Sequence, residues 1–193
     1  MKRFRSDIDI DVGDRQSVLK LIKHVAASSV NDDKIEKHNT GIYVTDIPND
    51  PNTNQSTIDY REAEERGYIK LDILNVSVYN QIHSEEELDV LLERSPPWHR
   101  LSDSAFFERI IHIGNAFYAY RQLDQPVDSI ERMAMFLALI RPAKRHLIGS
   151  PWKTIEQSIW QRPDNDDYYF KKSHGTAYAH LVAVHMNLVD LTD

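Results

Sequence analysis

Aspartates alternate with apolar residues near the start of the chain. Residues 6–12 read SDIDIDV, so Asp7, Asp9 and Asp11 occupy every second position. Because side chains alternate along a strand, these carboxylates would share one face, about 7 Å apart from one to the next. A divalent cation with a preference for hard oxygen ligands neutralises such a row of like charges. The alternative is a solvated strand face or a sheet edge blunted by charge.

A further aspartate interrupts a second apolar run, residues 69–74 (IKLDIL). Lys70 and Asp72 are two positions apart and would share a face of that strand. If the strand pairs with the first one, Asp72 joins Asp9 and Asp11. Two carboxylates on one strand and a third on its neighbour can hold two metal ions for in-line phosphoryl transfer. For Asp72 the alternative is a helix cap or a turn.

Two basic clusters stand in the last third of the chain. Arg can hold a phosphate through two parallel hydrogen bonds, and Lys supplies a point charge. These side chains could therefore bind a triphosphate opposite a metal site, or they could form a solvated helix end favoured by the helix dipole. The members of the two clusters are Arg141, Lys144, Arg145 and His146, followed by Lys171, Lys172 and His174.

Strands are expected in the first part of the chain and helices in the second. β-branched and aromatic residues predict strands over residues 4–12, 41–47 and 68–78, with a helix over residues 17–26 that Asp14 would cap. Residues 48–56 read as a surface loop. From Ser84 onward, apolar spacing predicts helices over residues 85–94, 103–120, 129–140 and 175–188, with a linker over residues 149–167 and Asp128 as the third helix's N-cap.

Length and composition describe an ordinary globular chain. The 193 residues are 41% hydrophobic and 27% charged, with a net charge of −7 and no cysteine. Disulfides, thiolate zinc sites and a cysteine nucleophile are therefore excluded, and net charge gives no general affinity for nucleic acid. We find no stretch apolar enough for a membrane span or a signal peptide and expect a cytoplasmic location without membrane contact.

Three segments of the first part resemble palm motifs of the alpha subunit of bacterial DNA polymerase III. Residues 6–12 (SDIDIDV) resemble the family's Pro-Asp-x-Asp-x-Asp-Phe strand, which carries two catalytic aspartates. Residues 36–42 (EKHNTGI) resemble Gly-Lys-His-Ala-Gly-Gly-Val. Residues 69–74 (IKLDIL) resemble Val-Lys-Phe-Asp-Phe-Leu, which carries the third catalytic aspartate.

Two later segments, in the family's order, resemble motifs of its fingers. Residues 138–142 (ALIRP) are similar to Ala-Leu-x-Arg-Pro, and residues 170–178 (FKKSHGTAY) are similar to Phe-Asn-Lys-Ser-His-Ala-Ala-Ala-Tyr. In size the chain resembles the short alpha-subunit-like proteins that some large phages encode.

The resemblance implies an α+β protein: a reduced nucleotidyltransferase-type palm sheet over residues 1–80, then a mostly helical fingers-like lobe over residues 81–193. It implies phage DNA replication by two-metal nucleotidyl transfer from a deoxynucleoside triphosphate onto a DNA primer-template, in the host cytoplasm. Asp9, Asp11 and Asp72 would be catalytic and would hold two Mg²⁺ or Mn²⁺ ions, with Lys70 steadying charge beside them. The nucleotide-binding residues would be Arg141, Lys144, Arg145, Lys171, Lys172 and His174.

A second hypothesis is a non-catalytic replication accessory, or a nucleotide- or protein-binding module derived from the palm and fingers. The family's Gly-Ser loop, which contacts the triphosphate, would fall before Met1, and the family's Arg-Pro-Gly-Pro reads Arg141-Pro142-Ala143-Lys144 here. A split polymerase completed by a partner chain lies between the two hypotheses. The aspartates favour an enzyme, because a pure scaffold has little use for carboxylates gathered on one face.

Overall fold

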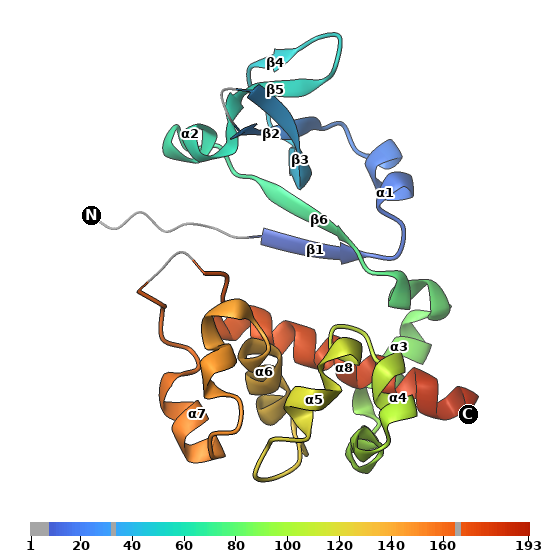
Figure 1. The fold of residues 1–193 in the computed structure, drawn as a ribbon. Helices are drawn as coiled ribbons and strands as arrows, with labels where there is room; N and C mark the ends of the chain where they lie inside the picture. The colour runs from blue at the N-terminus through green and yellow to red at the C-terminus, as the bar shows by residue number, and fades with distance from the viewer. Residues whose placement is uncertain (1–7, 32–33, 165–166) are drawn as a thin grey trace. The chain divides into compact units, whose positions relative to one another are not determined.

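The computed structural model describes residues 8–31, 34–164 and 167–193 and is an α+β protein, as the sequence predicts (Figure 1). The chain divides into two compact units, Met1–His83 and Ser84–Asp193. Within the described residues, the strands belong to the first unit and the second unit is helical. No helix of these residues is long and apolar enough to cross a lipid bilayer.

The first unit is built on a six-stranded mixed sheet of order β1-β6-β3-β2-β5-β4. Strand β1 lies at one edge and runs parallel to β6, which in turn pairs antiparallel with β3. The last strand of the unit is therefore interior, between the first strand and the long third one. The strands are β1 (Ile8–Val12), β2 (Val25–Asn31), β3 (Lys34–Tyr43), β4 (Asn49–Asp50), β5 (Gln55–Asp59) and β6 (Leu71–Asn75).

Helix α1 (Arg15–Leu21) follows the edge strand directly. The predicted cap is confirmed, since the Asp14 carboxylate accepts a hydrogen bond from the Gln16 backbone N–H at 2.9 Å. The guanidinium of Arg15 donates to the Ile73 carbonyl at 3.1 Å and so fastens the helix to β6. The helix ends before the predicted residue 26 because Val25 already begins β2, where cross-strand pairing outweighs helical spacing.

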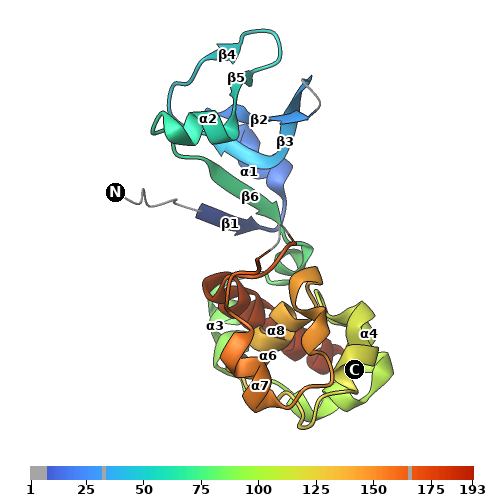
Figure 2. The ribbon, with the colours of Figure 1, turned by 60° about the vertical axis from the view of Figure 1, so that its left-hand side comes forward.

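Strand β5 and helix α2 (Tyr60–Glu65) were not predicted. The α2 helix begins after Asp59, whose side chain accepts a hydrogen bond from the Arg61 backbone N–H at 2.8 Å. Its Ala63 shares an apolar cluster with Tyr43 of β3. In Figures 1 and 2, α1 and α2 lie on opposite sides of the sheet, so each covers one face.

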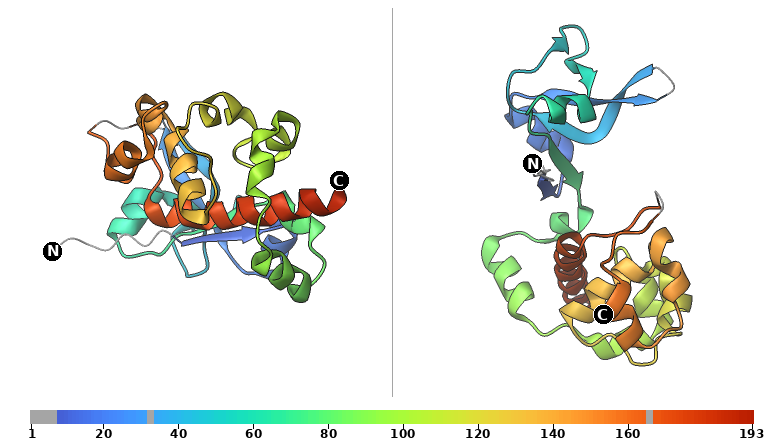
Figure 3. Two further views of the ribbon diagram at one scale, coloured as in Figure 1. Left: turned by 90° about the horizontal axis from the view of Figure 1, so that it is seen from below. Right: turned by 90° about the vertical axis from the view of Figure 1, so that its left-hand side faces the viewer.

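The second unit packs around α6 (Ile130–Leu139) and the 21-residue helix α8 (Lys172–Thr192), which runs through the helical unit in Figure 3. Residues 133–139 are all buried, which makes α6 the centre of the core. Its N-cap is Ser129, whose hydroxyl accepts from the Arg132 N–H at 3.2 Å, so the predicted Asp128 cap is wrong. Asp128 instead pairs with the Arg132 side chain at 3.2 Å.

The interval 103–120, predicted as one helix, is divided into α4 (Ser104–Arg109), a 3₁₀ turn η3 (Gly114–Ala116) and α5 (Phe117–Tyr120). The break lies at His112, whose φ of 66° is incompatible with a right-handed helix. The predicted linker also holds a helix, α7 (Trp152–Ser158), anchored by the Trp152 indole. The remaining elements are α3 (Glu85–Glu93) and the 3₁₀ helices η1 (Ser77–Gln81), η2 (Trp98–Ser102) and η4 (Pro142–Leu147).

Candidate functional site

The register of β1 and β6 places aspartates side by side. Asp9 is the direct partner of Asp72, and Asp11 follows two positions along β1. Paired residues of neighbouring strands project to the same face, and so do residues two apart on one strand. The three described aspartates therefore share one face of the sheet. Asp7, the first of the alternating row, lies outside the described residues.

Asp72 is the enclosed member of this row, with a side chain only 11% exposed. Its Oδ1 accepts a hydrogen bond from the Thr40 hydroxyl at 2.7 Å, and its Oδ2 accepts one from the Lys70 ammonium. The Nδ1 atom of His38 lies 3.8 Å from Oδ1. Both oxygens of the carboxylate are thus engaged by neighbours on β3 and at the start of β6.

Lys70 reaches Asp72 by crossing over Gly41 of β3. A Cβ atom on Gly41 would lie 2.8 Å from Lys70 Cδ and 2.9 Å from the Cβ of Ala27, closer than carbon atoms approach one another. The Lys70 ammonium also lies 5.6 Å from the centre of the Tyr60 ring, in cation–π contact. The glycine is required here because the lysine stem lies against the backbone.

His38 supports the strand beside the carboxylates. Its Nδ1 accepts a hydrogen bond from the Gly41 backbone N–H at 2.9 Å, and its ring meets Tyr60 edge-on with 5.2 Å between the centres. Burial lowers the pKa of His38 below its usual 6.5, and the Lys70 charge lowers it further. The ring is therefore neutral at pH 7 and acts as an acceptor that fixes the Gly41 backbone.

Burial and neighbouring negative charge both act on the ionisable groups at the edge strand. Burial raises the pKa of Asp11 above its usual 3.8, and the charge of Asp9 raises it further. The pKa of the Tyr79 phenol is also raised, by burial first and then by Asp11. A positive charge at this face would offset the repulsion between Asp9 and Asp11 and the effect of Asp11 on the Tyr79 phenol.

The donor types at this face suit Mg²⁺ or Mn²⁺, which prefer carboxylate oxygens. Among residues 8–31, 34–164 and 167–193, however, no three Asp, Glu or His side chains are gathered closely enough to form a ready metal cluster. On β6, the Lys70 ammonium occupies one oxygen of Asp72. A cation bound by all three aspartates requires that the ammonium move off this oxygen.

The basic residues singled out in the sequence belong to the second unit, and the structure separates them. Lys144 is buried and donates to the Ser158 carbonyl at 2.8 Å, so its amine supports the end of α7. Arg141 and Arg145 line one cleft together. Lys172 lines a different cleft, beside Trp160.

Two further basic candidates lie at the start of α8. Lys171 is the residue preceding the helix and is exposed, and His174 is half-buried in its first turn. The structure brings neither into the cleft of Arg141 and Arg145. Of the six predicted nucleotide ligands, two therefore share a site.

Three residues around these sites were not singled out as ligands from the sequence: Thr40, Tyr60 and His112. Thr40 and Tyr60 contact Asp72 or Lys70 only through long-range pairing of β3 with β6 and the placement of α2. The sequence around Thr40 or Tyr60 does not predict these long-range contacts. A histidine in the interval 103–120 carries no signal of its positive φ.

Comparisons with protein-family models, with curated proteins and with solved structures find no match to this chain. The resemblance to the polymerase family rests on the five sequence segments described above.

Proposed function

We propose that the chain is a reduced nucleotidyltransferase of the DNA polymerase III alpha type that acts in phage DNA replication, alone or completed by a partner chain. The observation that carries the proposal is the pairing of Asp9 with Asp72 on adjacent parallel strands, with Asp11 on the same face. Two carboxylates on one strand and a third on its neighbour match the donor set that two-metal phosphoryl transfer needs.

In this proposal Asp9, Asp11 and Asp72 hold the cations, which when bound activate the primer hydroxyl and stabilise the leaving oxygen. Thr40 orients the Asp72 carboxylate by its hydrogen bond to Oδ1. Lys70 neutralises that carboxylate when no cation is present and steadies negative charge beside it when one is. Deoxynucleoside triphosphate and DNA are the substrates.

The basic residues have unequal roles in the proposal. Arg141 and Arg145 are the strongest candidates for phosphate contact because their guanidinium groups line a cleft. Lys171, Lys172 and His174 remain candidates at the start of α8. Lys144 supports the fold instead, since its amine is buried against a carbonyl.

The second candidate function is a non-catalytic replication accessory or binding module. The observation that favours it is the complete satisfaction of Asp72 by Lys70 and Thr40. An aspartate with both oxygens hydrogen-bonded inside the fold is also what a structural ion pair looks like.

Calorimetric titration of Mn²⁺, with a deoxynucleoside triphosphate present, separates the two functions. We expect saturable binding by the wild type and at least a roughly tenfold loss in Asp9→Asn and Asp72→Asn, because each removes a charged ligand. Asp46→Asn is the matched control, since Asp46 is an exposed aspartate of the same unit and lies 3.9 Å from Lys23. Asp9 is exposed on an edge strand, so its variant should keep the fold.

Each outcome assigns the function. Binding that is lost in the two site variants and kept in Asp46→Asn supports the nucleotidyltransferase and justifies primer-extension assays. Binding that is unchanged by Asp9→Asn and Asp72→Asn contradicts the proposed metal ligands. A folded wild type without binding favours the accessory function.

A further inference from the structure

Backbone strain marks the loop between α4 and α5 of the second unit. His112 has a φ of 66°, in the left-handed region that a histidine seldom adopts. Two residues on, a Cβ on Gly114 would lie 2.5 Å from the carbonyl oxygen of Glu108, so the chain can pass there only as glycine. Non-glycine residues held in this region concentrate at functional sites, where the surrounding structure enforces the strain.

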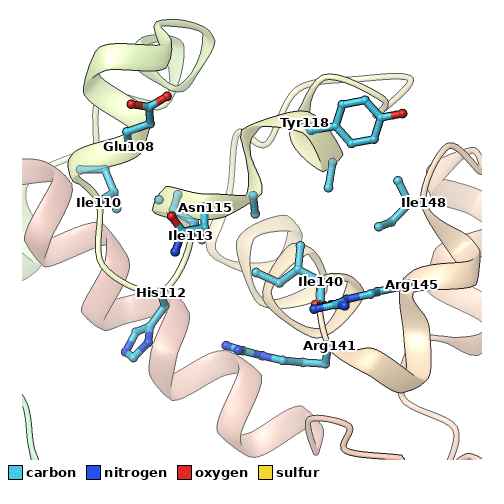
Figure 4. A pocket seen from close by; sticks show the side chains of 13 residues that line it. Glu108, Ile110, His112, Ile113, Asn115, Tyr118, Ile140, Arg141, Arg145 and Ile148 are labelled. Atoms are coloured by element: carbon cyan, nitrogen blue, oxygen red, sulfur yellow. Dashed lines mark hydrogen bonds between the residues drawn. The ribbon is translucent and has the colours of Figure 1, made fainter.

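A cleft of about 560 Å³ opens beside this loop, within the size range of small-molecule sites (Figure 4). Its lining includes His112 and Asn115 from the loop and Arg141 and Arg145 from the segment after α6. In Figure 4 the Arg141 guanidinium points toward the His112 ring, whereas the Glu108 carboxylate points away from both arginines. One end of the cleft is therefore cationic.

The Arg141 guanidinium is held against an aromatic ring, and one of its nitrogens lacks a protein acceptor. Its Cζ lies 4.2 Å from the centre of the Phe170 ring, and its buried Nε has no hydrogen-bond partner. Within the described part of the chain, neither Arg141 nor Arg145 forms an ion pair with a carboxylate. A buried donor without a partner costs free energy that a ligand acceptor can restore.

The surrounding charges strengthen this conclusion. Burial lowers the pKa of Arg141, Tyr168 and Tyr178 raise it in part, and the charge of Arg145 lowers it again. Burial, then Arg141 and His185, lowers the pKa of His112 to about 4, so its ring is neutral at pH 7 and offers a directed hydrogen bond rather than charge. Two arginines in one cleft repel each other unless an anion lies between them.

We propose that this cleft is a phosphate-binding site of the helical unit, in which Arg141 and Arg145 hold a phosphate group and His112 and Asn115 donate neutral hydrogen bonds. The proposal rests on the phosphate contact that the proposed function assigns to Arg141 and Arg145, and it deepens that contact. It adds His112 and Asn115 as donors, and binding here requires neither a divalent cation nor the aspartates of the first unit. Phosphate geometry suits paired guanidinium groups, each of which can donate two parallel hydrogen bonds.

The experiment is a calorimetric titration of inorganic phosphate and of pyrophosphate into the full chain, in a metal-free buffer that contains a chelator. We expect saturable binding that weakens about tenfold or more in Arg145→Gln and Arg141→Gln, since each removes a charge-assisted hydrogen bond. Arg162→Gln removes the same charge from an exposed position outside the cleft and should bind like the wild type. Asp9→Asn should also bind like the wild type.

Arg145→Gln is the decisive variant. Among the residues that the structure describes, the Arg145 side chain makes one hydrogen bond, from Nε to the Ile140 carbonyl at 3.2 Å, so its loss should leave the fold intact. A parallel titration with a short single-stranded oligonucleotide without terminal phosphate distinguishes a nucleic-acid backbone from a free phosphate as the source of the group. Absence of saturable phosphate binding, or equal weakening in Arg162→Gln, overturns the proposal. Loss of binding in Asp9→Asn also overturns it, because the site would then depend on the first unit.

Discussion

Replacement of Lys70 by methionine tests the ion pair at the centre of the proposed metal site. Methionine keeps much of the length of the lysine stem over Gly41 but removes the ammonium from Asp72 Oδ2. The carboxylate then retains the hydrogen bond from the Thr40 hydroxyl on its other oxygen. The variant therefore tests how much the Lys70–Asp72 ion pair stabilises the fold and whether a cation binds more readily once the ammonium is removed.

The structure sets the expected magnitude. The side chains of Lys70 and Asp72 are 20% and 11% exposed, so the pair is closer to a buried salt bridge than to a surface one. Loss of one partner costs about 3–5 kcal/mol for a buried pair and about 0–1 kcal/mol for an exposed pair. We expect Lys70→Met to lower the free energy of unfolding of the first unit by about 2 kcal/mol, because solvent and Thr40 moderate the loss.

Amide hydrogen exchange on β3 and β6 measures this loss locally. A change of about 2 kcal/mol corresponds to roughly 30-fold faster exchange where exchange follows opening of the unit. Addition of Mn²⁺ should then slow exchange more in Lys70→Met than in the wild type, because the cation no longer competes with an ammonium for Asp72. The three tryptophans, Trp98, Trp152 and Trp160, all belong to the second unit, so their fluorescence should be the same in both proteins.

The matched control is Lys23→Met. Lys23 lies 3.9 Å from Asp46 with both side chains fully exposed, and its loss should change stability by less than about 0.5 kcal/mol. If Lys70→Met is no more destabilising than this control, the enclosed ion pair has no structural value and our account of Asp72 is wrong. If Mn²⁺ protects the wild type and the variant equally, the ammonium does not compete with a cation.

Three other substitutions test the same unit. Gly41→Ala should destabilise it by about 1–3 kcal/mol in thermal unfolding, because the new methyl group would lie 2.9 Å from the Cβ of Ala27. Tyr43→Phe should unfold within about 1 kcal/mol of the wild type at pH 7, because the Tyr43 hydroxyl is buried without a partner. Burial raises the pKa of the Tyr43 phenol to about 12. The wild type therefore keeps its full free energy of unfolding below pH 10 and loses part of it as the pH rises toward 12. In urea unfolding, Tyr43→Phe should lose less stability over the same pH range. Asp11→Asn should abolish Mn²⁺ binding yet raise the free energy of unfolding measured with urea at pH 7, by roughly a few tenths of a kcal/mol after solvent screening. The sign follows from the raised pKa of Asp11: protonation favours the fold, so ionisation costs stability as the pH rises through the carboxyl range, and the gain should vanish near pH 3.

The strands that carry the aspartates could be predicted because their signal is local. Residues 8–12 alternate strictly, and residues 71–75 are rich in apolar side chains. Strand β2 could not be predicted in the same way, since its sequence VAASSVN is dominated by small residues. Its Ser28 is buried, and the hydroxyl donates to the Ser56 carbonyl of β5, a partner 28 positions away.

The site itself was predictable only in part, for the same reason. Alternation fixes which residues share a face of one strand, but the neighbour of a strand depends on the order of the whole sheet. The last strand enters between β1 and β3, and this crossover brings Asp72 beside Asp9 and within reach of Thr40. In the second unit, apolar spacing over residues 103–120 suggested a continuous helix, and the left-handed His112 that interrupts it became visible only in the structure.

The unfavourable ionisation of the aspartate row favours a cation-binding role over a role that only protects the sheet edge from pairing. An edge strand such as β1 can avoid edge-to-edge pairing with exposed charges of either sign, and lysine serves this purpose well. Here the charges are acidic and face an aspartate on the interior neighbour. Burial first and the charge of Asp9 second raise the pKa of Asp11, so its ionised form is unfavourable at this position. Lysine or threonine at position 11 would protect the edge without this penalty, so aggregation resistance alone does not account for the row. A bound group that supplies positive charge does account for the aspartate row. At Asp72, the enclosed carboxylate of the row, the Lys70 ammonium already supplies such a charge.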